Sequence, residues 1–204
     1  FSDRLLGTNN SFNETQKGYL ERMGKAACRM QALIEDLLKL SQVTTKGQPF
    51  QKVDLGKIAL EVIEDLDTKL QETRGKVTVV KLPHLEADPF QMRQLFQNLI
   101  ENALKYHKED VPPQVQLDSS FVTKEGWTIH VSDNGIGLDE KFSDRIFAPL
   151  ERLHGISTYE GTGIGLAICK KIVSRHRGSI FVKSQEGQGA TFTFTLPEIQ
   201  ASAI

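Results

Sequence analysis

The sequence predicts an α+β protein in which a helical hairpin precedes a two-layer α/β sandwich. Two observations predict this class. Up to residue 41, apolar residues recur at helical spacing over one long stretch. From residue 50 onward, shorter helical stretches are grouped with mostly antiparallel strand segments. We therefore expect two units, a helical unit at residues 1–47 and a sandwich at residues 48–204.

The amino-acid composition excludes several classes of protein. The 204 residues carry 25 Lys and Arg against 26 Asp and Glu, a net charge of −1, which argues against a nucleic-acid-binding surface. No apolar run approaches the ~18 residues of a membrane span. Two cysteines, Cys28 and Cys169, are too few for a disulfide scaffold. We expect a cytoplasmic chain without a membrane segment. Its first residues look like the middle of a helix, which indicates a fragment.

Residues 14–41 predict one long helix with a heptad seam. The seam residues are separated by alternating steps of three and four: Leu20, Met23, Ala27, Met30, Ile34, Leu37 and Ser41. Leu33 and Leu40 widen this stripe toward that of a helical bundle. We interpret the seam as an interface between two copies, completed by a preceding helix that ends near residue 7. A helix packed only on its own domain is the alternative.

From residue 50 onward, capping residues and apolar periods predict the elements of the sandwich. Asp54 caps a helix that runs to about Thr73, and Asp88 with Pro89 opens a second helix. The remaining expected elements are a strand at 77–82, a hairpin of strands 115–122 and 127–132, a helix at about 162–175, and a hairpin of strands 179–184 and 190–196. The irregular segment 134–161 is long for a connection and indicates a binding loop or lid.

The helix that Asp88 opens carries four polar residues on one face: Asn98, Asn102, Lys105 and Tyr106. Carboxamide oxygens suit Mg²⁺ and its waters, a Lys one turn later suits phosphate oxygens, and a Tyr ring can stack on a flat base. Two asparagines at this spacing are also common on solvent-exposed helix faces. The motif alone therefore leaves both interpretations open.

A second motif, Asp133 to Gly137 (DNGIG), directly follows an apolar strand. A carboxylate at a strand end can accept a hydrogen bond from the exocyclic amino group of adenine, and the two glycines let the backbone come close. Guanine presents a carbonyl there and would leave the carboxylate unpaired, at a cost of roughly 1–3 kcal/mol. By itself this motif is also a plausible turn.

A third motif, Gly161 to Leu166 (GTGIGL), opens a helix. Glycines before a helix N-terminus expose backbone N–H groups that can bind phosphate. The spacing matches neither the Rossmann nor the Walker pattern. A glycine-rich hinge is the alternative for this motif alone. Gly187 and Gly189 form a weaker fourth element, which can also simply serve the last hairpin turn.

Together and in this order, the motifs resemble those of the GHKL ATPase superfamily and, within it, sensor histidine kinases of the phytochrome-like or PAS-linked group. Residues 96–106 (FQNLIENALKY) resemble the N box, residues 133–137 the G1 box, residues 142–147 (FSDRIF) the F box and residues 161–168 (GTGIGLAI) the G2 box. Residues 29–43 (RMQALIEDLLKLSQV) resemble the second dimerisation helix of these kinases.

The resemblance implies a Bergerat-type catalytic ATP-binding domain at residues 48–204 and partial dimerisation helices at residues 1–47, with ATP and Mg²⁺ as ligands. It implies that Asn102 coordinates the metal with help from Asn98, and that Asp133 binds the adenine amino group. The other residues to which it assigns roles are Tyr106 and Thr191 beside the base, Gly135 and Gly137 where a lid begins, Lys105, Gly161, Thr162, Gly163, Gly165 and Leu166 around the phosphates, and Arg152 of the lid at the γ-phosphate.

The sequence departs from the resemblance in its histidines. These kinases phosphorylate a His on the first dimerisation helix, and no such motif is present. All five histidines lie in the expected sandwich: His84, His107, His130, His154 and His176. We expect each to be structural, with His84 in a turn and His176 at a helix C-terminus, where positive charge is stabilised. The phosphate acceptor is expected upstream of this chain.

The resemblance implies a protein-histidine kinase of a two-component system. It would transfer the γ-phosphoryl of Mg-ATP to a His outside this chain, and then to an Asp of a response-regulator receiver domain. A homodimer formed through the helical hairpin and an upstream sensor domain are the further implied partners. Two alternatives remain: an ATP-gated interaction module without phosphotransfer, and a related GHKL ATPase. Those ATPases place a general-base Glu where this chain has Asn98.

Overall fold

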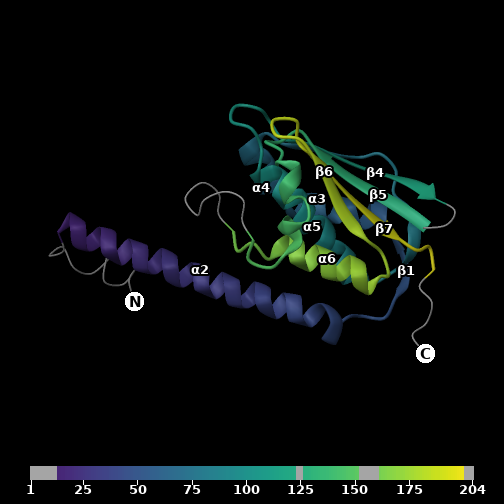
Figure 1. The fold of residues 1–204 in the computed structure, drawn as a ribbon, viewed down its shortest axis with the longest axis horizontal. Coiled ribbons are helices and arrows are strands. Elements are labelled where there is room, and N and C mark those ends of the chain that lie inside the picture. The colour runs from purple at the N-terminus through teal and green to yellow at the C-terminus, as the bar shows by residue number, and fades with distance from the viewer. Residues whose placement is uncertain (1–12, 123–125, 152–160, 200–204) are drawn as a thin grey trace.

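The computed structural model describes residues 13–122, 126–151 and 161–199. Its arrangement is a long helix, α2, that projects beside an α/β sandwich (Figure 1). The elements in chain order are α2 (Glu14–Thr45), β1 (Gln51–Asp54), α3 (Leu55–Asp65), α4 (Asp67–Thr73), β2 (Lys76–Val79), β3 (His84–Ala87), α5 (Pro89–Lys105), β4 (Gln114–Val122), β5 (Gly126–Asp133), the 3-10 helices η1 (Glu140–Phe142) and η2 (Arg145–Phe147), α6 (Gly165–Arg175), β6 (Ile180–Ser184) and β7 (Ala190–Leu196). The predicted α+β class is confirmed.

The main sheet has five strands in the order β2-β4-β5-β7-β6. Only β2 and β4 are parallel neighbours, and the other pairs are antiparallel. A second sheet, β1 with β3, was not predicted, because four-residue strands are too short to show a period of two. His84 belongs to this sheet, where it is paired with Asp54, so its predicted placement in a turn is wrong.

Three helices, α3, α5 and α6, cover one face of the main sheet, so that helices form one layer and strands the other (Figure 1). The predicted apolar stripe of α5 is buried, from Met92 to Leu104. Phe96 on this stripe packs on Phe194 of β7 with ring centroids 6.3 Å apart, and both rings are fully buried. Burial of one such side chain contributes about 2–3 kcal/mol to stability, so this layer contact fixes α5 on the sheet.

The helix predicted from Asp54 to Thr73 is interrupted at Leu66, which separates α3 from α4. The N–H of Leu66 is shared between the carbonyls of Val62 and Ile63, both at 3.1 Å, a tightening typical of a 3-10 turn. Leu66 itself is buried, so the chain bends at a residue held in the core. Helical periodicity continues through such a bend, which is why the sequence pattern did not reveal it.

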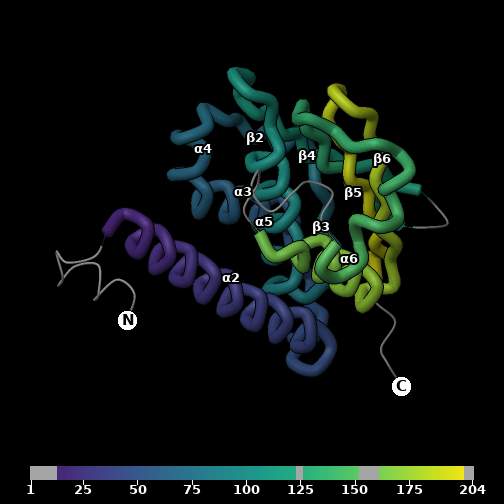
Figure 2. The backbone as a smooth tube through the Cα atoms, turned by 60° about the vertical axis from the view of Figure 1, so that its left-hand side comes forward, coloured from purple at the N-terminus to yellow at the C-terminus, as the bar shows by residue number. Residues whose placement is uncertain are grey.

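Helix α2 begins as predicted and ends four residues later than predicted. Asn13 and Gln16 form a capping box, with N–H to side-chain distances of 2.9 and 3.0 Å. The seam is largely exposed, as Met23, Met30, Ile34 and Leu37 show. Leu33 and Leu40 do not extend this stripe as predicted, because they are half-buried against the sandwich. One face of α2 therefore packs on the domain and another is left open (Figure 2).

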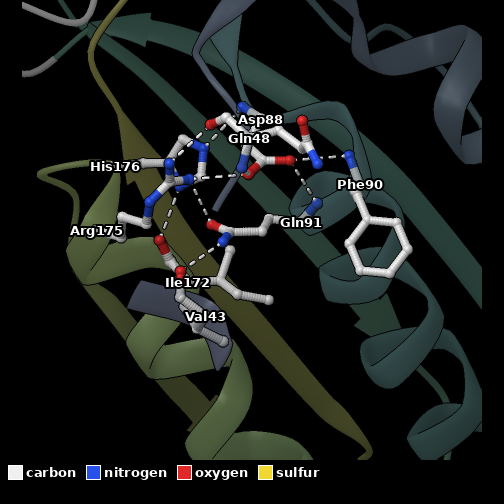
Figure 3. Close-up of polar contacts among 8 residues, drawn as sticks. All are labelled: Val43, Gln48, Asp88, Phe90, Gln91, Ile172, Arg175 and His176. Carbon is white, nitrogen blue, oxygen red and sulfur yellow. Dashed lines mark hydrogen bonds and ion pairs between the residues drawn. The ribbon is translucent and has the colours of Figure 1, made fainter. Parts of the chain in front are cut away.

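A buried polar cluster around Asp88 fastens the end of α2 to the sandwich (Figure 3). Asp88 caps α5, with Oδ1 accepting from the backbone N–H groups of Phe90 and Gln91 at 3.1 and 3.2 Å. Its Oδ2 accepts from the backbone of Gln48 at 2.6 Å and from the guanidinium of Arg175 at 2.9 Å. The Asp88 side chain is only 1% exposed, so this charge is fully paired.

The same cluster reaches the last turn of α2. Gln91 donates its side-chain N–H to the carbonyl of Val43 at 2.7 Å and accepts from Arg175 at 2.9 Å. Arg175 also donates to the carbonyl of Gln48 at 2.7 Å and lies over the ring of Phe50. Val43 is the one buried residue of α2 among those described. We call the set of Val43, Gln48, Asp88, Gln91, Arg175 and His176 the Asp88 cluster.

His176 completes the Asp88 cluster as a neutral imidazole rather than as a cation. Its Nε2 accepts from the backbone N–H of Asp88 at 3.1 Å, and its Nδ1 lies 2.8 Å from the carbonyl of Ile172. Burial lowers the pKa of His176, and the charge of Arg175 acts in the same direction. The prediction of a dipole-stabilised positive charge at this helix end is therefore wrong, since desolvation outweighs the dipole.

Candidate functional site

A cavity of about 640 Å³ lies where α5, the segment after β5 and the segment before α6 meet. This volume is in the usual range for a small-molecule site. Its lining combines polar and apolar side chains: Asp36, Lys69, Glu72, Thr73, Asn98, Glu101, Asn102, Leu104, Lys105, Tyr106, Asp133, Ile136, Gly137, Leu138, Ile146, Glu151, Gly161, Thr162, Gly163, Gly165, Leu166, Ala190 and Phe192. All three sequence motifs contribute, so the structure brings them together as predicted.

The predicted polar face of α5 points into this cavity. Asn98, Asn102, Lys105 and Tyr106 all line it, while the opposite stripe of α5 is buried in the core. Lys105 donates to the hydroxyl of Tyr106 at 2.7 Å and lies 4.2 Å from the centre of its ring. The interpretation as a solvent-exposed asparagine pair is therefore excluded. One face of the Tyr106 ring is already taken by the Lys105 ammonium.

Asp133 stands at the end of β5 with one oxygen held and one left for a ligand. Its Oδ1 accepts from the backbone N–H groups of Gly135 at 2.8 Å and Ala190 at 3.2 Å. No residue in the described ranges donates to Oδ2. Burial raises the pKa of Asp133, and the two backbone bonds and the charge of Lys108 only partly oppose this. A ligand that donates a hydrogen bond to Oδ2 would relieve this desolvation.

The glycines of the second motif permit close backbone approach. The N–H of Ile136 donates to the carbonyl of Tyr106 at 2.9 Å, which ties this loop to the end of α5. A side chain at Gly135 would collide with the same carbonyl. Gly137 has φ +66° and faces the carbonyl of Gln185, so it meets both a conformational and a steric need for glycine. Gly135 itself is not among the residues that line the cavity.

The third motif forms a loop that leads into α6. Gly161 and Gly163 have φ of +144° and +74°, and α6 begins at Gly165, three residues later than predicted, because these conformations are not helical. No side chain of the described residues caps the α6 N-terminus. Lys105 lies so close that a Cβ on Gly161 would meet its Nζ at 2.8 Å. An ammonium and an uncapped helix N-terminus therefore converge on the same end of the cavity.

Asn98 joins α5 to α6 across the cavity. Its side-chain amide lies 3.4 Å from the carbonyl of Gly165, at the outer limit for a hydrogen bond. It also contacts the thiol of Cys169, whose pKa is raised to about 12 by burial. Asn98 thus helps to position the helix that carries the third motif. It remains on the cavity wall beside Asn102.

Thr191 of β7 is not brought to the site. Thr191 is hydrogen-bonded to Ser132 at 3.0 Å, on the sheet face opposite to its neighbours Ala190 and Phe192, which line the cavity. The placement of Thr191 beside the base is therefore corrected, because side chains alternate along β7. Arg152 lies outside the described residues, as does most of the second half of the expected lid. Nothing in the structure tests its proposed role.

Several cavity residues were not predicted. The apolar end includes Ile146 of the F-box segment and Phe192, which stacks edge-on with Phe147 at 6.4 Å. Gly189 has φ +82° and packs on the backbone of Asp133, so the last hairpin turn is fitted to the site, a role that the sequence left open. Ala190 and Phe192 alternate with Thr191 along β7, but this pattern alone does not show which of the two sides faces the cavity.

Charged residues at the opposite end were also missed. Glu101 pairs with Lys69 of α4 at 2.6 Å, and both line the cavity. Asp36 reaches the cavity from α2 and accepts from the hydroxyl of Thr162 at 2.6 Å. No local pattern could indicate that contact, because its partners are 126 residues apart in the chain.

Comparison with known proteins agrees with this geometry. Residues 87–200 match the model of the histidine kinase-, DNA gyrase B- and HSP90-like ATPase family, and the chain belongs to this family. Within it, the chain is 46% identical over 168 residues to cyanobacterial phytochrome A of a Nostoc species, covering 82% of this chain and 22% of that protein. It is 34% identical over 174 residues to the adaptive-response sensory kinase SasA of a Synechococcus species, covering 83% of this chain and 46% of that protein.

A crystal structure of full-length ShkA in complex with AMPPNP shares the fold, with a TM-score of 0.72, 24% identity, and coverage of 99% of this chain and 42% of that one. The phytochrome and the SasA kinase named above confirm the resemblance to sensor histidine kinases of the phytochrome-like group. The chain spans between about a fifth and a half of the length of the two curated relatives named above. In the described ranges, no helix is both long and apolar enough to cross a membrane.

Proposed function

We propose that this chain is the ATP-binding catalytic part of a protein-histidine kinase in a two-component system. One observation carries the proposal. A single cavity has an acidic hydrogen-bond acceptor at an apolar end and carboxamides, an ammonium and an uncapped helix N-terminus at the other. A purine triphosphate has the matching order of groups: a flat base with an amino group, then a chain of anionic phosphates.

Each end of the cavity suits one part of ATP. The free oxygen of Asp133 accepts the adenine amino hydrogen, and Ile136, Ala190 and Phe192 enclose the flat base. Tyr106, which also lines the cavity, is the residue proposed to lie beside the base. At the other end, Lys105 and the backbone of residues 161–166 (Gly161, Thr162, Gly163, Gly165 and Leu166 among them) hold the phosphates.

The residues present fit a magnesium ion. No group of three or more His, Cys, Asp and Glu side chains in the described ranges is arranged to hold a metal. A cation here therefore depends on neutral oxygens, water and the phosphates, the ligand set that Mg²⁺ accepts in nucleotide sites. Asn102 is the proposed ligand and Asn98 its assistant, both on the cavity wall. When bound, the ion neutralises phosphate charge.

The proposed reaction is phosphoryl transfer from ATP to a histidine that this chain does not supply. A ring nitrogen of that His attacks the γ-phosphorus, the bond to the bridging oxygen breaks, and ADP leaves with the bond electrons. An Asp of a response-regulator receiver domain then takes the phosphoryl group. The contribution of this chain is positioning and charge neutralisation. Arg152 remains a proposed contact of the γ-phosphate.

We assign residues 1–47 to a dimerisation unit and residues 48–204 to the ATP-binding domain. The exposed seam of α2 supports the first assignment, since an unpaired apolar stripe on a long helix is typical of a bundle interface. The segment after Thr45 separates the two units. A homodimer, a receiver domain and an upstream sensor are the proposed partners, and the cytoplasm is the proposed location.

The proposal is tested with γ-labelled ATP. The chain is mixed with a longer chain that carries an upstream helix with a His followed by an acidic residue. A kinase gives a phosphoprotein that is stable to base and labile to acid. An ATP-gated interaction module binds ATP but transfers no label. A related ATPase releases phosphate instead, which we do not expect because Asn98 stands where a general-base Glu would be needed.

A further inference from the structure

A contact between α2 and the glycine loop lies at the phosphate end of the cavity. The hydroxyl of Thr162 donates to Oδ2 of Asp36 at 2.6 Å. The Asp36 side chain is 24% exposed and lines the cavity, although it belongs to the helix outside the sandwich. Its other oxygen pairs with Lys39 at 3.1 Å on the same helix. Asp36 is thus the point where α2 reaches the proposed nucleotide site.

Besides the packing of Leu33 and Leu40, α2 has two polar attachments to the sandwich, and they differ in strength. Near its C-terminal end, α2 is held by the buried bond from Gln91 to the carbonyl of Val43, and just after the helix Gln48 bonds to both Asp88 and Arg175 (Figure 3). Asp36 lies seven residues earlier, about 10 Å along the axis, and contributes one hydrogen bond to a partly exposed hydroxyl. The Asp88 cluster is therefore a fixed pivot, and the Asp36–Thr162 contact is the attachment that can open.

A triphosphate competes with this contact in two ways. The hydroxyl of Thr162 has one proton, and it cannot donate to Asp36 and to a phosphate oxygen at the same time. The carboxylate of Asp36 also repels phosphate charge brought to the same loop, and partial burial keeps this repulsion from being fully screened. Adenosine has no phosphates and meets neither obstacle.

We propose that the Asp36–Thr162 contact is a latch that holds α2 across the phosphate end of the cavity and that a nucleoside triphosphate displaces. The position of α2 then reports whether the site is occupied. The latch rests on the proposed function, because it needs phosphates at residues 161–166. It adds a coupling between the nucleotide and the helix that the nucleotide-binding geometry alone does not require.

Binding affinity tests the repulsion. We expect Asp36→Asn to bind Mg-ATP about tenfold more tightly than the natural chain in calorimetry, with adenosine affinity unchanged. Glu35→Gln is the matched control: it removes the same charge one residue away, where the exposed carboxylate accepts only from Gln31 among the described residues. Unchanged ATP affinity, or an equal gain for adenosine, overturns the latch. Absence of both ATP and adenosine binding in the natural chain overturns the proposed function as well.

Energy transfer tests the movement. The single tryptophan of the sequence, Trp127 in β5, is the donor, and an acceptor dye on the exposed Cys28 of α2 is the partner. Excess unlabelled chain with the Trp127→Phe substitution suppresses transfer between copies, because it carries no donor. We expect ATP, but not adenosine, to change the transfer efficiency. Nucleotide-free Asp36→Ala should already show the ATP-bound value. Equal efficiencies in all four states overturn the latch while leaving nucleotide binding intact.

Discussion

Replacement of Asp133 by Asn should reverse the base preference of the site. The asparagine carbonyl keeps the place of Oδ1, because the N–H groups of Gly135 and Ala190 both point at it and can only donate. The amide nitrogen is then forced into the position of Oδ2, facing the cavity. A donor replaces an acceptor at nearly constant shape, so the adenine amino group meets another donor, whereas the guanine carbonyl meets a partner.

The size of the effect follows from the lost bond and the new mismatch. A hydrogen bond to a charged group contributes about 1.5–3 kcal/mol, and two donors that face each other each lose a partner, at about 1–3 kcal/mol. A loss of about 3–5 kcal/mol is expected, on the order of a 10²- to 10⁴-fold weaker binding of ATP. GTP, which gains an acceptor-to-donor match, should bind more tightly than it does to the natural chain.

Calorimetric titration with ATP and GTP measures this change, and thermal unfolding checks the fold. Burial raises the pKa of Asp133, so the ionised carboxylate costs folding free energy at neutral pH, and the neutral variant should unfold at an equal or higher temperature. An unaltered ratio of ATP to GTP affinity in a folded variant would falsify the assignment of Asp133 to the base.

Further substitutions test the other parts of the structure. Asn102→Ala should abolish the magnesium-dependent part of ATP binding without loss of fold, whereas Gln97→Ala, at an exposed position of the same helix, should not; equal calorimetric titrations of the two would count against the metal site. Asp88→Ala should lower the free energy of unfolding in urea by about 3–5 kcal/mol, since it leaves Arg175 without its carboxylate and α5 without its cap, and Asp88→Asn should cost less because it keeps the cap acceptor. The pKa of His176 is lowered in the folded chain, so the stability that its neutral form contributes is fully present above the unfolded pKa of about 6.5 and is lost as the pH falls through the folded pKa. The free energy of unfolding should therefore fall less between pH 7.5 and pH 5.5 in His176→Gln than in the natural chain, and identical decreases would contradict the buried neutral imidazole. A maleimide should label one thiol per folded chain, at Cys28, and two after unfolding, because burial raises the pKa of the Cys169 thiol to about 12; two labels on the folded chain, counted by mass spectrometry, would contradict that burial.

The elements that the sequence predicted well are those with local signals. Helix α5 has an N-cap Asp followed by Pro and an unbroken apolar stripe, so its start followed from the cap, and its buried and cavity-facing sides followed from spacing. The strands β4, β5 and β7 are long enough to alternate. The three motifs met in one cavity because each was correctly placed at the end or on the face of such an element.

The features that the sequence did not predict depend on contacts between distant residues. Thr191 and Ala190 are neighbours in the chain, and only the register of β7 against β5 decides which of them faces the cavity. Strands β1 and β3 are each four residues long and exist because they pair with each other. His176 has the sequence context of a helix-end cation, and it is neutral because burial in the folded chain lowers its pKa and the backbone N–H of Asp88 donates to its Nε2.

The two faces of α2 allow the latch to open without disturbing a dimer. Leu33, Asp36, Leu40 and Val43 recur at steps of three and four, and this face meets the sandwich. At about 100° per residue, Ile34 is about 160° from Asp36 around the helix, so the exposed seam lies on another side. Release of Asp36 from Thr162 changes only the domain-facing contacts. In the proposed dimer the sandwich can therefore pivot at the Asp88 cluster while the helices stay paired, which places the mobile contact at the nucleotide and not at the dimer interface.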